Sequence, residues 1–108
     1  MQLTVRKMMQ TSGPGYVVKY TADFDAVPST DAVTASVANW MPDDAEPTLV
    51  ELAREFIADA FTQVLNPRGL PATVVIRDLV IHDVDFSEYA FKRFTIAGLE
   101  ALLAESSA

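Results

Sequence analysis

The sequence predicts an α+β domain of two layers, a four-stranded sheet with two helices on one of its faces. Runs rich in β-branched and aromatic residues, typical of strands, occupy residues 3–9, 16–24, 32–40 and 70–81. Apolar residues recur at helical spacing over residues 48–65 and 90–103. The order along the chain is therefore β-β-β-α-β-α, and 108 residues are enough for one such domain and too few for two.

The first two runs predict a hairpin. Residues 3–9 form a weak strand and residues 16–24 a strong one, and the segment between them contains Gly13, Pro14 and Gly15, which are turn-forming residues. The third run, 32–40, is compatible with a strand or a helix, and the period-two placement of its apolar residues favours a strand. An acidic loop bounded by two prolines follows it.

The stretch from Thr48 onward is the clearest helix. Thr48 and Glu51 have the spacing of a capping box, and an apolar stripe follows until Pro67 and Gly69 end it. A helix with one apolar stripe is stable only on a partner surface, which the sheet supplies. Residues 70–81 are almost continuously apolar and β-branched, which predicts a strand inside the sheet.

A polar junction joins that strand to the second helix. It contains His82, the only histidine in the chain, followed by Asp83 and Asp85. Asp85 and Glu88 have capping-box spacing, so we expect Asp85 to cap the helix and Glu88 to reach back to it. Gly98, inside the apolar stripe of this helix, predicts a close approach, with the other helix as one candidate neighbour.

Composition excludes several classes of protein. There is no cysteine and one histidine, so no thiolate or multi-histidine metal site exists in one chain, and no cofactor is expected. The chain has no phosphate-loop motif, its first residues do not have the pattern expected of a signal peptide, no window is apolar enough to predict a membrane span, and the expected setting is the cytoplasm. Fifteen acidic against eight basic residues give a net charge of −7, which argues against non-specific binding to a phosphate backbone.

The junction resembles a signature of domain IV of translation elongation factor G. The matching residues are His82-Asp83-Val84-Asp85, Ser87-Glu88 and Ala90-Phe91-Lys92, and Phe86 stands where the family has serine. Gly69-Leu70-Pro71 and Gly13-Pro14-Gly15 are weaker matches to the same domain. The resemblance implies a left-handed β-α-β crossover, against the usual right-handed rule.

In that family, domain IV enters the ribosomal decoding site, and the histidine lies on a tip loop that faces RNA. The resemblance therefore implies ribosome or RNA contact through His82, with the hairpin turn as a second tip loop. The expected contact residues are His82, Asp83, Gly13, Gly15, Arg6 and Lys7. Because the chain has no GTPase motif, we expect a non-enzymatic module.

Other interpretations stay open at this point. His82 is a junction residue bonded to its own loop, an RNA contact, or an acid–base group oriented by Asp83. Asp83, Asp85 and Glu88 have the oxygen ligands of a hard cation, although capping explains two of the three. As an alternative function, the fold is a protein-binding or homo-oligomeric module that pairs through its sheet edges.

Overall fold

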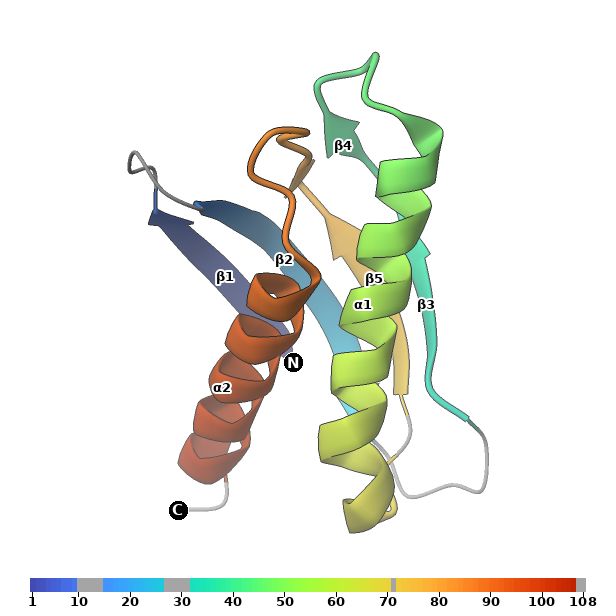
Figure 1. Cartoon of the computed structure of the whole chain (residues 1–108). Coiled ribbons are helices and arrows are strands. Elements are labelled where there is room, and N and C mark those ends of the chain that lie inside the picture. Colours follow the sequence, from blue (N-terminus) through green and yellow to red (C-terminus); the bar gives the residue numbers. More distant parts are fainter. Residues whose placement is uncertain (10–14, 27–31, 71, 107–108) are drawn as a thin grey trace.

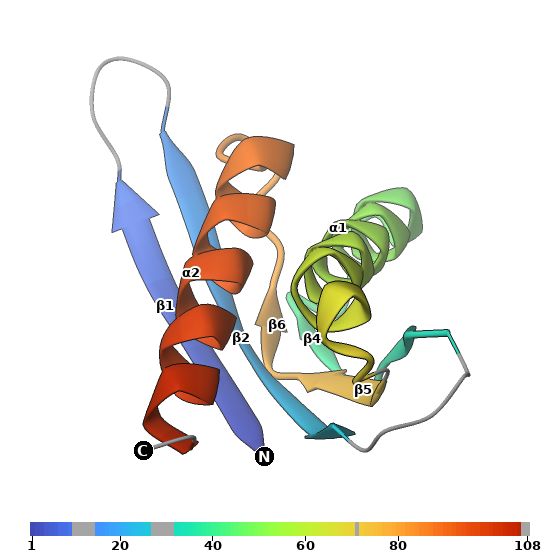
Figure 2. The same ribbon diagram turned by 90° about the horizontal axis from the view of Figure 1, so that it is seen from below.

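The computed structural model describes residues 1–9, 15–26, 32–70 and 72–106. Its main sheet has the strand order β1-β2-β5-β3. These strands are β1 (Gln2–Met9), β2 (Tyr16–Ala26), β3 (Thr34–Val37) and β5 (Ala72–Arg77). Two helices, α1 (Pro47–Leu65) and α2 (Glu88–Ser106), lie side by side on one face of the sheet (Figures 1 and 2). The predicted fold class and element order are confirmed.

The crossover from β3 to β5 through α1 is left-handed. β1 and β5 both pair with β2 in antiparallel fashion, whereas β3 pairs with β5 in parallel. In Figure 1 both parallel strands point upward, α1 lies in front of them, and the chain moves from β3 on the right to β5 on its left. A right-handed unit would move the other way, so this domain departs from the common rule.

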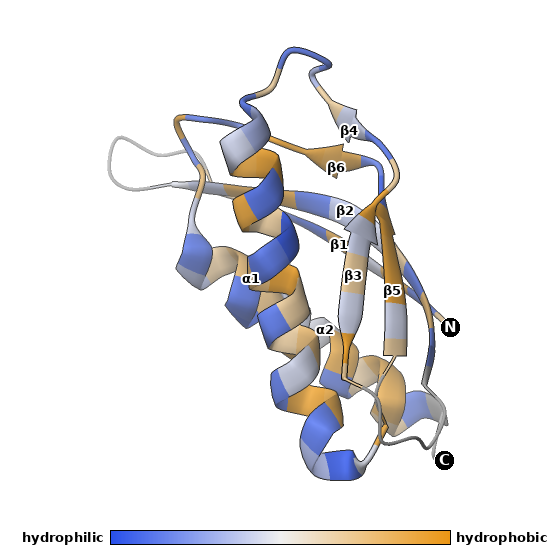
Figure 3. Ribbon diagram, turned by 90° about the vertical axis from the view of Figure 1, so that its right-hand side faces the viewer, coloured by the Kyte–Doolittle hydropathy of each residue, from blue (hydrophilic) through white to orange (hydrophobic). Residues whose placement is uncertain are grey.

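The core lies between the helices and the covered face of the sheet. Alternate residues of the strands and the apolar stripe of α1 supply its buried side chains. In Figure 3 the ribbon of α1 alternates between hydrophobic and hydrophilic residues along its length. Phe61 of α1 meets Phe24 of β2 edge to face, with 5.1 Å between ring centroids. Gly98 of α2 faces strand β1: a Cβ there would lie 3.0 Å from Leu3 Cδ1. The close approach predicted at Gly98 is therefore between helix and strand.

Two predicted strands are each divided in the structure. The run 70–81 is broken at Asp78, whose φ of 55° is left-handed, so that β5 ends and the two-residue strand β6 (Leu79–Val80) begins after it. The run 32–40 likewise yields β3 and a separate β4 (Trp40–Met41), which pairs in parallel with β6. Asp tolerates the left-handed conformation better than the β-branched residues around it.

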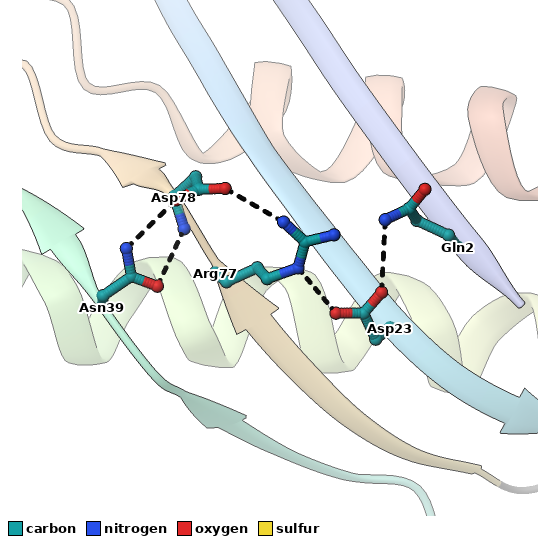
Figure 4. Close-up of polar contacts among 5 residues, drawn as sticks. All are labelled: Gln2, Asp23, Asn39, Arg77 and Asp78. Carbon is teal, nitrogen blue, oxygen red and sulfur yellow. Dashed lines mark hydrogen bonds and ion pairs between the residues drawn. The ribbon is translucent and has the colours of Figure 1, made fainter.

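A polar network on the uncovered face of the sheet spans this break (Figure 4). The Asn39 side chain donates to Asp78 Oδ1 at 3.1 Å and accepts from the Asp78 N–H at 3.2 Å. Arg77 donates to Asp23 at 2.7 Å, and this bond lowers the pKa of the Asp23 carboxyl below its usual range. Gln2 donates to the other oxygen of Asp23. The junction between the two sheets is thus held by side chains.

One hydrogen bond lies inside the core, between the hydroxyls of Tyr20 on β2 and Thr95 on α2. Both residues are buried, and burial raises the pKa of the Tyr20 phenol well above its usual range. Each hydroxyl satisfies the other, as the burial of polar groups requires.

Removing one of these hydroxyls should cost more than removing both. We expect Tyr20→Phe or Thr95→Val to lower the free energy of unfolding by about 1–3 kcal/mol, because each leaves a buried hydroxyl unpaired. The double variant should be destabilised by clearly less than the sum of the two. Urea denaturation of the four proteins measures this coupling, and additive losses would contradict the pairing.

Candidate functional site

The loop between β6 and α2 contains the predicted tip residue His82, and a tight turn shapes this loop. The Asp85 N–H donates to the His82 carbonyl at 3.1 Å and lies 3.3 Å from His82 Nδ1. Asp85 Oδ2 also lies 3.3 Å from Nδ1. His82 is therefore an organising residue of its own loop, with its side chain still 41% exposed. The following residues, Asp83 and Val84, are exposed.

Helix α2 begins three residues after Asp85, so the predicted cap is wrong. The helix starts at Glu88, and the Ser87 hydroxyl accepts from the Ala90 N–H at 3.1 Å, as an N-cap does. Glu88 pairs with Lys92 at 2.8 Å, one helical turn later. Phe86 separates Asp85 from the cap and packs against the core.

The capping box predicted for the first helix is also wrong. Helix α1 starts at Pro47, with Glu46 at the cap position and no side-chain cap bond. Proline suits the first helical position because its fixed φ is helical and the N–H it lacks would be unpaired there. Glu51 forms an ion pair with Arg54 instead.

Asp85 joins the loop to the start of β2. Its carbonyl accepts from the Val17 N–H at 3.2 Å, and its side chain is 15% exposed. A Cβ on Gly15 would lie 2.9 Å from Asp85 Oδ1 and 2.4 Å from the Met9 carbonyl oxygen. The His82 loop and the end of the β1–β2 hairpin are thus in contact, at the upper end of the molecule in Figure 1. Gly13 lies outside the described residues.

Four basic side chains lie along the hairpin and the adjoining part of α2, two on each face of the sheet. On the uncovered face, Arg6 of β1 lies directly across from Lys19 of β2. On the helix side, Lys7 Nζ lies 5.9 Å and Arg93 Cζ 5.5 Å from the ring centroid of Phe94. Within the described parts of the chain, none of these four forms an ion pair. Ion pairs are formed by other basic residues, namely Arg54, Arg77 and Lys92.

We name this group, Arg6, Lys7, Lys19 and Arg93, the hairpin cation cluster. The sequence interpretation included Arg6 and Lys7 and missed the other two. Strand register brings in Lys19, because residues 6 and 19 are partners in β1–β2. The packing of α2 on β1 brings in Arg93. Like charges placed directly across two strands repel, so an anion at this surface would relieve that repulsion.

Aromatic groups and an open depression adjoin the cluster on α2. Arg93 Cζ lies 5.9 Å from the ring centroid of Tyr89, which is 70% exposed. The depression is lined by Glu88, Tyr89, Lys92, Arg93 and Ile96. His82 is not among its lining residues, so the depression does not place His82 at a substrate cavity.

No metal centre accompanies these groups in the part of the chain that the structure describes. Among those residues, no three His, Asp or Glu side chains are arranged to hold a metal ion. The hypothesis that Asp83, Asp85 and Glu88 bind a hard cation therefore has no support from the geometry of the described residues. In the same residues, neither helix has the length and apolar character needed to cross a bilayer. Comparison with models of protein families and with curated proteins finds no match to this chain.

The two caps can be compared by matched substitutions. We expect Ser87→Ala to lower the free energy of unfolding by about 1 kcal/mol, because the Ala90 N–H loses its acceptor. Thr48→Ala should change it by at most a few tenths of a kcal/mol, since Thr48 lies inside α1 and caps nothing. Thermal or urea unfolding of the two variants measures the difference, and equal losses would refute this cap assignment.

The close approach at Gly15 makes a second prediction. Gly15→Ala places a methyl group against the Met9 carbonyl, and we expect a loss of about 1–3 kcal/mol in unfolding free energy as the hairpin end shifts. Gly98→Ala is the control, because its methyl meets side-chain atoms and no backbone, namely Leu3 Cδ1 at 3.0 Å and Val5 Cγ2 at 4.0 Å, and alanine favours a helix. If Gly15→Ala is as stable as Gly98→Ala, the close approach at Gly15 is disproved.

Proposed function

We propose that this chain is a non-enzymatic module that associates with ribosomal RNA through the end carrying the hairpin cation cluster and the His82 loop. The observation that carries the proposal is the cluster itself: four basic side chains without ion pairs to any described residue, on a protein whose net charge is −7. Phosphate groups are the abundant anions that such a cluster fits.

The architecture supports the same proposal. The element order and the left-handed crossover agree with what the resemblance to domain IV of elongation factor G implies. The His82 loop also lies against the hairpin end, as two neighbouring tip loops would. In this proposal His82 shapes the loop through its bond with the Asp85 N–H, and the cations supply most of the affinity.

The negative net charge does not oppose a local contact of this kind. At physiological salt the screening length is about 8 Å, so charges on the far side of the domain contribute little at this end. The two cations on either face of the hairpin would lie within a few ångströms of a phosphate bound to that face. The affinity should therefore depend strongly on salt.

The alternative of pairing between copies through the sheet edges receives less support. Edge strand β1 carries Arg6 and Lys7, and charged residues on an edge oppose pairing with another strand. On the other edge, β3 has only four residues, and Arg54 of α1 lies 3.5 Å from the carbonyl oxygen of Ala35. Both edges of the sheet therefore have features that oppose pairing with a strand of another copy.

Ribosome co-sedimentation tests the proposal. We expect the protein to pellet with ribosomes at about 50 mM salt and largely to dissociate at about 200 mM. The double variant Arg6→Ala/Lys19→Ala should bind roughly tenfold or more weakly, and its salt slope should fall by about 1 for each phosphate that is no longer neutralised. Both side chains lie on the solvent face of the hairpin, so the fold should be preserved.

The matched control is Arg68→Ala. Arg68 belongs to the short 3-10 helix after α1 (Asn66–Arg68), at the other end of the domain, and also forms no ion pair within the described residues. This variant should bind as the unchanged protein does. The proposal fails if the protein does not pellet at low salt, or if the double variant binds as well as Arg68→Ala.

A further inference from the structure

We infer that the nucleic acid taken by this surface is single-stranded, and that one of its bases stacks on Tyr89 in the depression of α2. The inference rests on the proposed function in one respect: the hairpin cation cluster is again the group that meets phosphate. The base site at Tyr89 and the preference for a single strand come from separate observations.

The cluster is divided between the two faces of the sheet. Leu3 and Val5 of β1 are buried beneath the helices, so Arg6, one residue further along, points to the uncovered face. Its partner Lys19 points the same way. Lys7 points to the helix side, where it meets Phe94 together with Arg93. Two of the four cations therefore lie on the uncovered face near edge strand β1, and the other two lie on its helix side.

This division favours a flexible ligand over a rigid one. A duplex is stiff over lengths far greater than this domain and would meet one face of the hairpin at a time. A single strand can pass around the free edge of β1 and bring phosphates to both faces. Because β1 ends the strand order, none of the described strands blocks that path.

The depression on α2 supplies a place for a base. Tyr89 is 70% exposed, and its ring has a cation, Arg93, at 5.9 Å. On the other side of the depression the charges of Glu88 and Lys92 are paired at 2.8 Å, and Ile96 adds an apolar surface. A base on the Tyr89 ring would place its phosphate near Arg93, whose charge has no ion-pair partner among the described residues. Such stacking contributes about 1–3 kcal/mol per base.

Fluorescence anisotropy with free oligonucleotides tests the inference. The probes are an oligoadenylate of about twelve nucleotides, the same strand in a duplex with oligouridylate, and an abasic strand of equal length. We expect the single strand to bind at least tenfold more tightly than the duplex. Tyr89→Ala should weaken single-strand binding roughly five- to hundredfold, while Tyr89→Phe, which keeps the ring, should bind as the unchanged protein does.

The abasic strand separates stacking from charge. It should bind the Tyr89→Ala variant and the unchanged protein equally, because both retain the hairpin cation cluster. The inference is overturned if the duplex binds as tightly as the single strand, if Tyr89→Ala has no effect, or if polyglutamate competes as well as oligoadenylate, which would indicate an acidic polypeptide as the partner.

The two proposals fail in different ways. Binding to ribosomes with no effect of Tyr89→Ala on oligonucleotides would leave the proposed function in place and remove the base site. If oligonucleotide binding depends on Tyr89 but the protein does not co-sediment with ribosomes, the base site stands and the proposed ribosomal function is removed. Because Tyr89 is mostly exposed, its substitution should leave the unfolding transition unchanged, which a urea titration checks.

Discussion

The contact between the β6–α2 loop and the start of β2 fixes the arrangement of the functional end. A main-chain bond from the Val17 N–H to the Asp85 carbonyl places the His82 loop against the hairpin. Only glycine fits at position 15, since a side chain there would meet the Met9 carbonyl and Asp85. The helix that follows the loop is thereby positioned over β1, and with it Arg93 and Tyr89.

Much of the fold was predictable because its signals are local. The periodicity of α1 and of the hairpin strands identified them, and the order of elements gave the two layers. The break at Asp78 was not predictable, because the run 70–81 is almost continuously apolar and the turn depends on Asn39, 39 residues away. The start of α2 was misplaced for a similar reason: Asp85 has the spacing of a cap, but its side chain and carbonyl are engaged by His82 and β2.

The candidate site was predictable in part. The sequence identified the His82 loop, the hairpin and the basic pair at residues 6 and 7. It did not identify the hairpin cation cluster, because its members lie far apart along the chain and meet only through strand register and helix packing. Charges counted along the sequence suggest a uniformly acidic surface. The distribution in space matters more, since acidic groups pair with Arg54, Arg77 and Lys92, whereas the four members of the hairpin cation cluster form no ion pair with any described residue.

The polar network on the uncovered face has a consequence for folding fidelity. Its members come from β1, β2, the end of β5 and the segment after β3, so it is complete in one strand alignment only. Exposed ion pairs of this kind add little to stability, typically about 0–1 kcal/mol each. A shift of β5 by one residue, however, would turn Arg77 toward the core, where an unpaired charge costs several kcal/mol. The network therefore adds little to the stability of the fold, and its main effect is to favour the observed register of β5 over shifted registers.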